Sequence, residues 1–214
     1  MKQIPVIFYA LLFVLIPCMA SCKGSTEHVK AAMQEEFQQL FKSLQQHDFK
    51  KAATYMSPEL IKAMHSSDKQ MEQLLAANFG NDTFLHIEHK LLSVEMIVPN
   101  SVLEQNDKSY AVIHAAIKMA LVFDLKNEDI NEAEEDMDAL KSLVAAMYGD
   151  RMEIGEVTHS DGRAVLNIKE NRLIAAIYDK TTKKTTFALS EKMMKSFYDD
   201  FLPKEIIDEM EEQL

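Results

Sequence analysis

The first residues with a spacing suited to chemistry are the histidines and the glutamate of His86-Ile87-Glu88-His89. Imidazole and carboxylate groups bind zinc, which needs three or four ligands converging on one point. The surrounding residues alternate with a period of two, which predicts a strand, and strand residues three apart point to opposite faces. No second ligand cluster is evident in the sequence. We therefore predict no metal site, and two histidines at the surface or rim.

A second candidate is the acidic run at residues 128–138, which holds seven acids in 11 residues. An EF-hand calcium loop needs acids at its odd positions, glycine at the sixth and glutamate at the twelfth. Counted from Asp129, Ala133 stands at the fifth position and Glu134 at the sixth, so the motif fails. The run instead predicts a solvated helix face that would attract a basic protein partner.

Cys22 is the third candidate, because of the residues that precede it. Lys2 is followed by an unbroken apolar run of 11 residues, 6–16, and then by small residues. A membrane-spanning helix needs about 20 apolar residues, so this run fits the apolar region of a secretory signal peptide. The stretch Met19-Ala20-Ser21-Cys22 resembles the lipobox of bacterial lipoproteins.

This resemblance implies that residues 1–21 are removed as a signal peptide and that the sulfur of Cys22 becomes lipidated. Met19 stands where the family more often has leucine. Such lipoproteins typically carry three acyl chains, and each buried methylene contributes about 0.8 kcal/mol, so the anchor would be permanent. An ordinary signal peptide with a free Cys22, or an uncleaved short anchor, is the alternative.

Composition limits the classes of function that remain. Without residues 1–21 the chain of 214 keeps 193 residues, which suits a single domain. Cys18 leaves with the signal peptide, so Cys22 would have no cysteine partner for a disulfide. The formal net charge is −11, and loss of Lys2 makes it −12. So acidic a chain is unsuited to nucleic acid, which requires clustered lysine and arginine.

Apolar residues at steps of three and four predict helices in the N-terminal part of the chain. A short helix is expected after Asp48, and another start at Ser57-Pro58-Glu59, where serine suits the N-cap and proline the first turn. This helical part is expected to continue to Gly80. The first and longest stripe consists of Val29, Met33, Phe37, Leu40, Phe41 and Leu44.

After Asp82 the apolar period changes to two, which predicts strands. The apolar face switches at Leu91-Leu92, and this switch predicts a bulge or bend in one long strand. Residues 99–108 are expected to form a polar loop, and residues 111–123 form the clearest strand, with apolar side chains at odd positions.

The second half of the chain is expected to begin with a helical insert. Its apolar stripe starts near the end of the acidic run, and Gly149 closes it. Residues 164–168 and 173–177 predict two strands or one continuous strand, and residues 185–189 predict the last strand. Apolar residues from Met193 to Met210 predict a C-terminal helix interrupted at Pro203.

Segregated helices and antiparallel strands define an α+β protein. The run FKSLQQHDFKKAATYMSPEL resembles the opening of small envelope lipoproteins built on the nuclear-transport-factor-2-like or cystatin-like cone fold. The stretches DGRAVLNI, LIAAIYDK and KKTTFAL resemble their closing strands. The resemblance covers residues 28–190. It implies a cystatin-like cone, with N-terminal helices on a curved antiparallel sheet, in a single domain at 28–214 after a lipidated tether at 22–27.

Enzymes with a cone fold use a histidine with an aspartate or tyrosine inside the cone as acid and base. His114 is out of phase with Ile113 and Ile117 and is therefore predicted to face away from the core. These observations favour a non-enzymatic envelope protein without a cofactor, which binds a protein or a small apolar ligand or serves as a scaffold. The alternative is a cone-fold lyase, isomerase or hydrolase acting on a small apolar substrate.

The predicted partners are the membrane, through the Cys22 lipid, and a basic protein, through residues 128–138. The resemblance to lipoproteins implies a location in the bacterial cell envelope. Surface-exported lipoproteins of the Bacteroidetes type carry acidic pairs after the cysteine, whereas residues 23–27 contain only one acid, Glu27. We therefore expect the periplasm-facing side of the outer membrane, with surface exposure as the alternative.

Overall fold

A computed structural model of the protein describes residues 7–80, 87–97, 99, 101–124, 141–142, 152–160, 163–189 and 195–211. Side chains are described from residue 26 onward, except at 87, 124, 152, 160 and 195. The helices are α1 Ile7–Gln45, α2 Phe49–Ala53, α3 Pro58–Ala63, α4 Asp68–Phe79, α6 Lys195–Tyr198 and α7 Lys204–Glu211. The strands are β1 Ile87–Ile97, β2 Leu103–Gln105, β3 Lys108–Asp124, β4 Met152–Ser160, β5 Arg163–Asp179 and β6 Lys184–Leu189.

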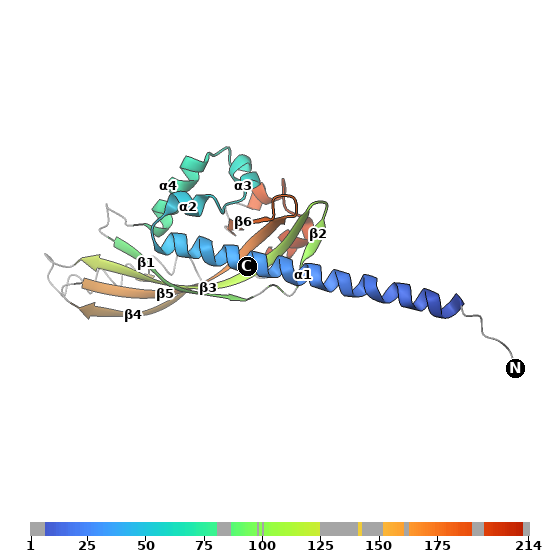
Figure 1. The fold of residues 1–214 in the computed structure, drawn as a ribbon. Helices are drawn as coiled ribbons and strands as arrows, with labels where there is room; N and C mark the ends of the chain where they lie inside the picture. The colour runs from blue at the N-terminus through green and yellow to red at the C-terminus, as the bar shows by residue number, and fades with distance from the viewer. Residues whose placement is uncertain are drawn as a thin grey trace.

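The long helix α1 carries the predicted apolar stripe, and all six of its residues are buried. The helix begins earlier than expected, so the tether at 22–27 is helical and continuous with the packed part. Its N-terminal part projects beyond the sheet (Figure 1). It ends in a Schellman motif, in which the Asp48 N–H donates to Ser43 and the His47 N–H to Leu44. His47 adopts the required left-handed conformation, with φ of 56°.

Three short helices follow, each opened by an N-cap in the sequence. Asp48 caps α2, Ser57 caps α3, and Ser67 forms a capping box with Gln70 at the start of α4. The helical part predicted to continue to Gly80 is therefore two helices. His65 closes the first of them at φ 50°, and Ser67 opens the second.

The six strands form one antiparallel sheet in the order β1-β3-β5-β4, with β2 paired to β3 and β6 to β5. The two possible strands at 164–168 and 173–177 are one continuous strand, β5. The loop predicted at 99–108 contains β2, and β4 was not predicted; neither short stretch shows a clear alternation of apolar residues. The mixed helices and antiparallel strands confirm the α+β class.

The bulge predicted in β1 is confirmed. Leu91 pairs with Met119 and Ser93 with Lys118, so Leu92 is the extra residue. The amide of Gln45, at the end of α1, donates to the carbonyls of Leu91 and Leu92, both at 3.2 Å. The helix therefore satisfies the carbonyl groups that the bulge removes from regular pairing.

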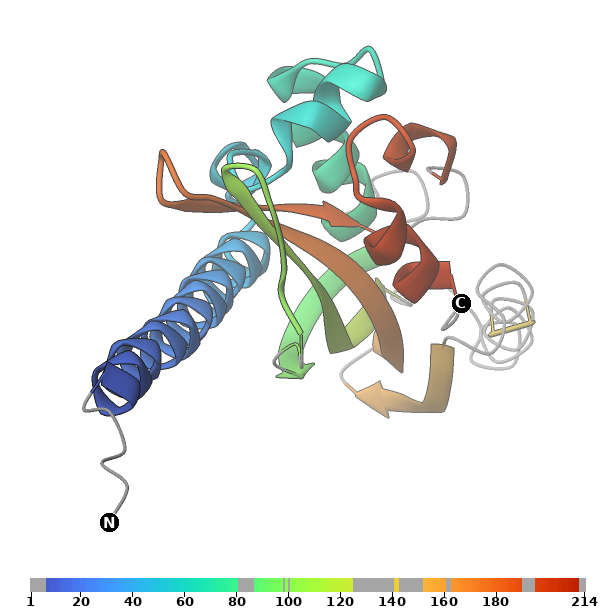
Figure 2. The same cartoon turned by 90° about the vertical axis from the view of Figure 1, so that its right-hand side faces the viewer.

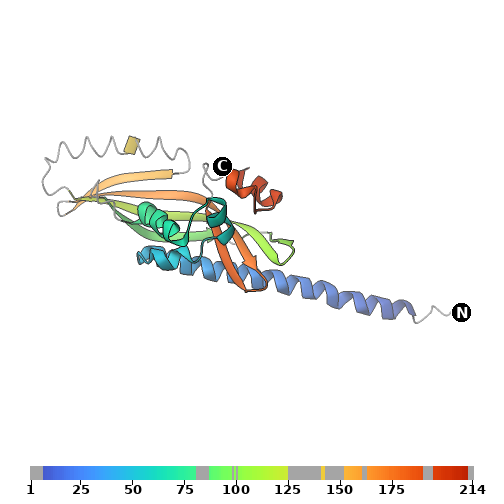
Figure 3. The same cartoon turned by 90° about the horizontal axis from the view of Figure 1, so that it is seen from above.

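Helices cover both faces of the sheet (Figure 3). The inner face packs against α1, and its core includes Ala111, Ile113, Ala115 and Ile117, the odd positions of β3. On the outer face Val112 and Ala175 join Ile206 of α7 in a second core. The interruption expected at Pro203 is confirmed, because this residue separates α6 from α7.

The edge of β6 is covered by the chain between α2 and α3. Met56 forms a parallel bridge with Phe187, whose N–H donates to the Tyr55 carbonyl at 2.8 Å. The Ser57 N–H in turn donates to the Phe187 carbonyl at 2.9 Å. These bonds satisfy backbone groups that an open sheet edge would expose.

Candidate functional site

Cys22 lies within α1, seven residues before Val29, which is the first buried residue of the described side chains. At 1.5 Å per residue this is about 10 Å of helix. The side chain of Cys22 is outside the described part. No helix among the described residues is both long and apolar enough to cross a membrane.

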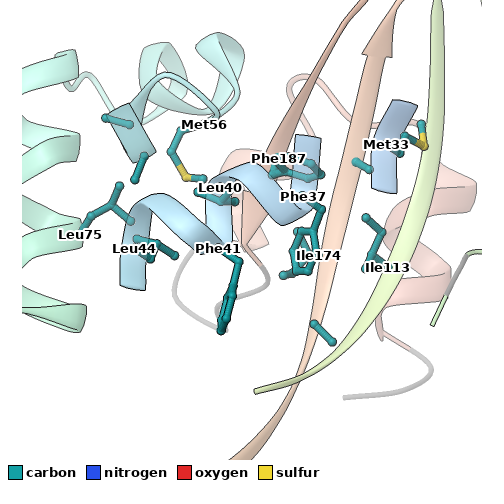
Figure 4. Close-up of a cluster of buried hydrophobic side chains, with 14 of the residues drawn as sticks. Met33, Phe37, Leu40, Phe41, Leu44, Met56, Leu75, Ile113, Ile174 and Phe187 are labelled. Atoms are coloured by element: carbon teal, nitrogen blue, oxygen red, sulfur yellow. The ribbon is translucent and has the colours of Figure 1, made fainter. Parts of the chain in front are cut away.

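The interior of the domain holds a small pocket between α1, α4 and the inner face of the sheet. Its volume is about 20 Å³, which is space for about one water molecule. Figure 4 shows Phe37, Phe41 and Ile174 filling the region around it. The lining residues are Phe37, Leu40, Phe41, Leu44, Met56, Leu75, Phe79, Leu91, Ile117, Arg172, Ile174 and Leu189.

Arg172, the polar residue among these, forms a buried ion pair with Glu170. The Arg172 Nε lies 2.7 Å from Glu170 Oε1, and the two side chains are 12% and 6% exposed. The guanidinium carbon of Arg172 is 5.8 Å from the centre of the Phe79 ring. Glu170 Oε2 is buried and has no hydrogen-bond partner. Arg172 is thus the charged residue of the pocket lining, and Glu170 is its ion-pair partner.

The pair stands between two apolar clusters on the inner face of β5. Ile174 belongs to the core under α1, and Leu166 and Ile168 belong to a cluster at the other end of the strand. Residues of one parity share a face of a strand, so Glu170 and Arg172 complete this row. A general acid or base must reach a substrate atom directly or through one water. The pocket beside Arg172 has no volume for a substrate.

Of the two histidines predicted at the surface or rim, the structure describes only His89. His86 is outside the described residues, and Glu88 is 3.2 Å from Lys90. His89 is in register with Leu121 on the inner face, and its Nδ1 is buried without a partner. The part of the chain that is described contains no cluster of three or more His, Cys, Asp or Glu residues suited to a metal.

His114 lies on the outer face, as predicted. It is in register with Ile97 of β1 and Leu173 of β5, while its neighbours Ile113 and Ala115 belong to the core under α1. The histidine therefore points away from the pocket and from the Glu170–Arg172 pair.

The inner face of the sheet also contains two buried hydroxyl groups. Ser109 and Thr185 are each in register with Tyr178, on either side of it. Ser109 Oγ and Thr185 Oγ1 are buried and have no hydrogen-bond partner. A hydroxyl group acts as a catalytic nucleophile when an adjacent base activates it. None of the residues in the described ion pairs lies in this row, so Ser109 and Thr185 lack such a base among them.

A polar cluster joins α3 to the start of β3. Glu59 accepts hydrogen bonds from Lys108 Nζ and, at 2.9 Å, from Ser57 Oγ. Burial by itself raises the pKa of Glu59, but the hydrogen bonds from Lys108 and Ser57 and the charge of Lys108 outweigh it, so the pKa is lowered. Burial lowers the pKa of Lys108, and the bond to Glu59 reverses this to a net increase. Both shifts stabilise the charged forms, which suits a structural pair rather than a proton-transfer pair.

Sequence reasoning missed the Glu170–Arg172 pair although a signal exists. In a continuous strand the two charges share the parity of Ile168 and Ile174, so they must face the core. The signal is hidden because the apolar residues have even numbers in 164–168 and odd numbers in 173–177, so the sequence leaves two strands and one continuous strand open. The acidic run at 128–138 and the apolar stripe of the helical insert lie outside the described residues.

No family model matches this chain, and no curated protein or solved structure matches it either.

Proposed function

We propose that this chain is a lipid-anchored protein of the bacterial cell envelope whose domain acts as a non-enzymatic binding or scaffold module. The observation that carries the non-enzymatic part is the close packing between α1 and the inner face of the sheet in the part of the domain that is described. The pocket between them, beside Arg172, measures about 20 Å³. Ligand pockets typically measure about 300–1,000 Å³.

The proposal includes a cystatin-like or nuclear-transport-factor-2-like cone. It is supported by the long strands β3 and β5, each of 17 residues, and by the bulge in β1. It is also supported by the bend of the strands around α1 (Figure 2). In this proposal α1 occupies the concave side, so binding would use the outside of the domain.

The lipid anchor is supported by the resemblance of residues 19–22 to a lipobox. With the lipid on Cys22, the helical tether at 22–27 would hold the domain close to the bilayer. We place the protein on the periplasm-facing side of the outer membrane, with the cell surface as the alternative.

The test of the anchor is Cys22→Ala in the full chain, with Cys18→Ala as the matched control. Cys22→Ala should block processing and release the protein from the membrane fraction. Cys18→Ala should leave both unchanged, because Cys18 would be removed with the signal peptide. Mass spectrometry of the mature N-terminus decides the result, and an unmodified terminus at another residue would refute the anchor.

The alternative function is a cone-fold lyase, isomerase or hydrolase acting on a small apolar substrate. One observation favours it, namely the buried Glu170 with an unpartnered carboxylate oxygen. An enzyme of this kind would lose turnover in Glu170→Gln while still folding. Assays of the wild-type protein and of Glu170→Gln with a library of small apolar substrates test this alternative. Absence of turnover by the wild-type protein would contradict the enzyme and favour the binding module.

We propose further that residues 128–138 bind a basic protein. Replacing Glu132, Glu134, Glu135 and Asp136 with Gln or Asn should leave the melting temperature nearly unchanged and weaken binding of an oligolysine probe at low salt. Unfolding of the variant would mean that the run is structural. A control variant removes four exposed charges elsewhere: Glu95, Glu153, Glu205 and Asp208.

A further inference from the structure

Two turns lie side by side at one end of the sheet. The β2–β3 turn contains Asn106 at φ 54°, and the β5–β6 turn contains Lys183 at φ 57°. The Lys180 N–H donates to the Asp107 carbonyl at 2.8 Å, and Lys180 Nζ is 2.9 Å from Glu104 Oε2. These bonds fix the two turns to each other.

The β5–β6 turn is basic although the chain as a whole is strongly acidic. Its sequence at 180–184 is KTTKK, with three lysines and no acid, and the net charge of the chain is −11. Lys183 and Lys184 are exposed, and neither forms an ion pair within the described part of the chain.

Two of the three nearby carboxylates are engaged within the turns. Glu104 pairs with Lys180, and Asp179 Oδ1 accepts the N–H groups of Thr181 and Thr182, both at 2.8 Å. These N–H bonds lower the pKa of Asp179, the one from Thr182 most. Asp107 is the exposed carboxylate left over. The bonds to Asp179 also fix the backbone of the turn, in which Lys183 and Lys184 are exposed.

The turn lies on the side of the domain from which α1 projects. Phe187 of β6 meets Phe37 of α1, with ring centres 5.6 Å apart. From there β6 leads back to Lys184 and the turn, which Figure 3 shows beside the middle of α1. Cys22 is also near the middle of this helix, which runs from Ile7 to Gln45.

We propose that the β5–β6 turn contacts anionic lipid headgroups of the bilayer that holds the Cys22 anchor. This inference rests on the proposed lipid anchor. A lysine near an anionic surface strengthens such a contact about fivefold, so Lys183 and Lys184 together give at most about 25-fold, and the charges of Asp107 and Asp179 beside them reduce this. That is weak for a free protein. In an anchored protein the turn is held near the bilayer at millimolar effective concentration. The weak contact is then sufficient to decide which end of the domain faces the membrane.

The experiment uses the lipidated full chain in vesicles of phosphatidylcholine, with and without phosphatidylglycerol. Thr182→Cys carries a fluorophore on the turn, and Asn171→Cys carries it on the exposed middle of β5 as a control. Quenching by a headgroup-attached quencher should increase severalfold at position 182 when phosphatidylglycerol is present, and high salt should remove the increase. Quenching at position 171 should not change.

Charge variants identify the contact. Lys183→Gln with Lys184→Gln should abolish the increase, and Asp107→Asn should enlarge it. The matched control is Lys50→Gln with Lys51→Gln, an adjacent exposed pair on α2, which should change nothing. Failure of the protein to stay on any vesicle would refute the anchor itself. An anchored protein whose position 182 responds to neither phosphatidylglycerol nor the lysine variants would overturn the membrane contact alone.

Discussion

Arg172 and Glu170 form an ion pair inside the apolar inner face of the sheet, with 2.7 Å between Nε and Oε1. Two charges two residues apart on a strand share a face, so the register of β5 forces both into the core. Their neighbours on that face, Ile168 and Ile174, are buried. Removal of charges from water is costly, and the pair offsets this cost only while both partners are present.

The first prediction follows from this pair. Arg172→Met should lower the free energy of unfolding by about 3–5 kcal/mol, because it leaves the Glu170 carboxylate alone in the core. Adding Glu170→Leu to it should restore most of the loss, since an apolar replacement of a buried pair is often neutral. Urea denaturation of both single variants and of the double variant gives the coupling energy. A loss in the double variant equal to the sum of the two single losses would mean that the pair is not coupled.

The second prediction concerns the packing of α1 on the sheet. Phe37 and Phe41 are 3% and 8% exposed, and Phe37 contacts Phe187 edge to face. Replacement of either by alanine should cost about 3–5 kcal/mol, against a typical total stability of about 5–15 kcal/mol.

Two variants control this measurement. Phe37→Leu keeps most of the volume and should remain folded if the alanine variant does not. Leu92→Ala, at a side chain that is 51% exposed, should cost less than about 0.5 kcal/mol. Losses below about 1 kcal/mol at both phenylalanines would contradict burial of the stripe in solution.

Local sequence signals were sufficient where the residues of a single element determine its structure. The stripe from Val29 to Leu44 has one buried side, and the N-cap Ser57 has one structural role, so both were predictable. The bulge at Leu92 was predictable because a change of parity in a strand needs an extra residue.

Contacts between distant segments account for what was missed. The second core on the outer face of β3 was not predicted, because burial of Val112 under α7 is not encoded in the period of the strand. The short strand β2 is held by its register with β3 rather than by its own pattern. In the interior, the burial of Glu170 follows from the continuity of β5, which the sequence alone does not establish.

The third prediction uses the two histidines at helix ends. His65 closes α3 in a left-handed conformation, with φ of 50°, and its N–H donates to Lys62. A side chain is strained there and glycine is not. His65→Gly should therefore raise stability by about 0.5–1 kcal/mol, while His65→Ala keeps the strain and should not.

His47→Gly should gain less than His65→Gly, although φ is 56° at this position. The His47 ring stacks on Phe49, with centres 5.5 Å apart, and glycine removes this contact. Thermal melts of the four variants, two with glycine and two with alanine, test the comparison. A glycine variant at position 65 no more stable than its alanine counterpart would show that the strain is absent.

The fourth prediction is a pH dependence carried by Glu59 and Lys108. Burial opposes the charge on Glu59, but the bonds from Lys108 and Ser57 lower its pKa overall. A lowered pKa in the folded state means that the stabilisation is present above the unfolded value, about 4.3, and is lost as the pH falls through the folded value. Lys108 has a raised pKa, so its share is present below about 10.4 and is lost as the pH rises through its folded value.

The pair should therefore stabilise the protein at neutral pH and fail at both extremes. Glu59 and Lys108 are about one-third exposed, at 36% and 29%, so solvent screening limits the contribution to about 1 kcal/mol or less. The difference in unfolding free energy between the wild type and Glu59→Gln should be largest near pH 7 and shrink below about pH 4. Asp208→Asn, which breaks an exposed pair with Lys204 on α7, is the control and should show a smaller difference. A difference for Glu59→Gln that stays constant from neutral to acid pH would mean that the loss comes from the N-terminal turn of α3 and not from the ion pair with Lys108.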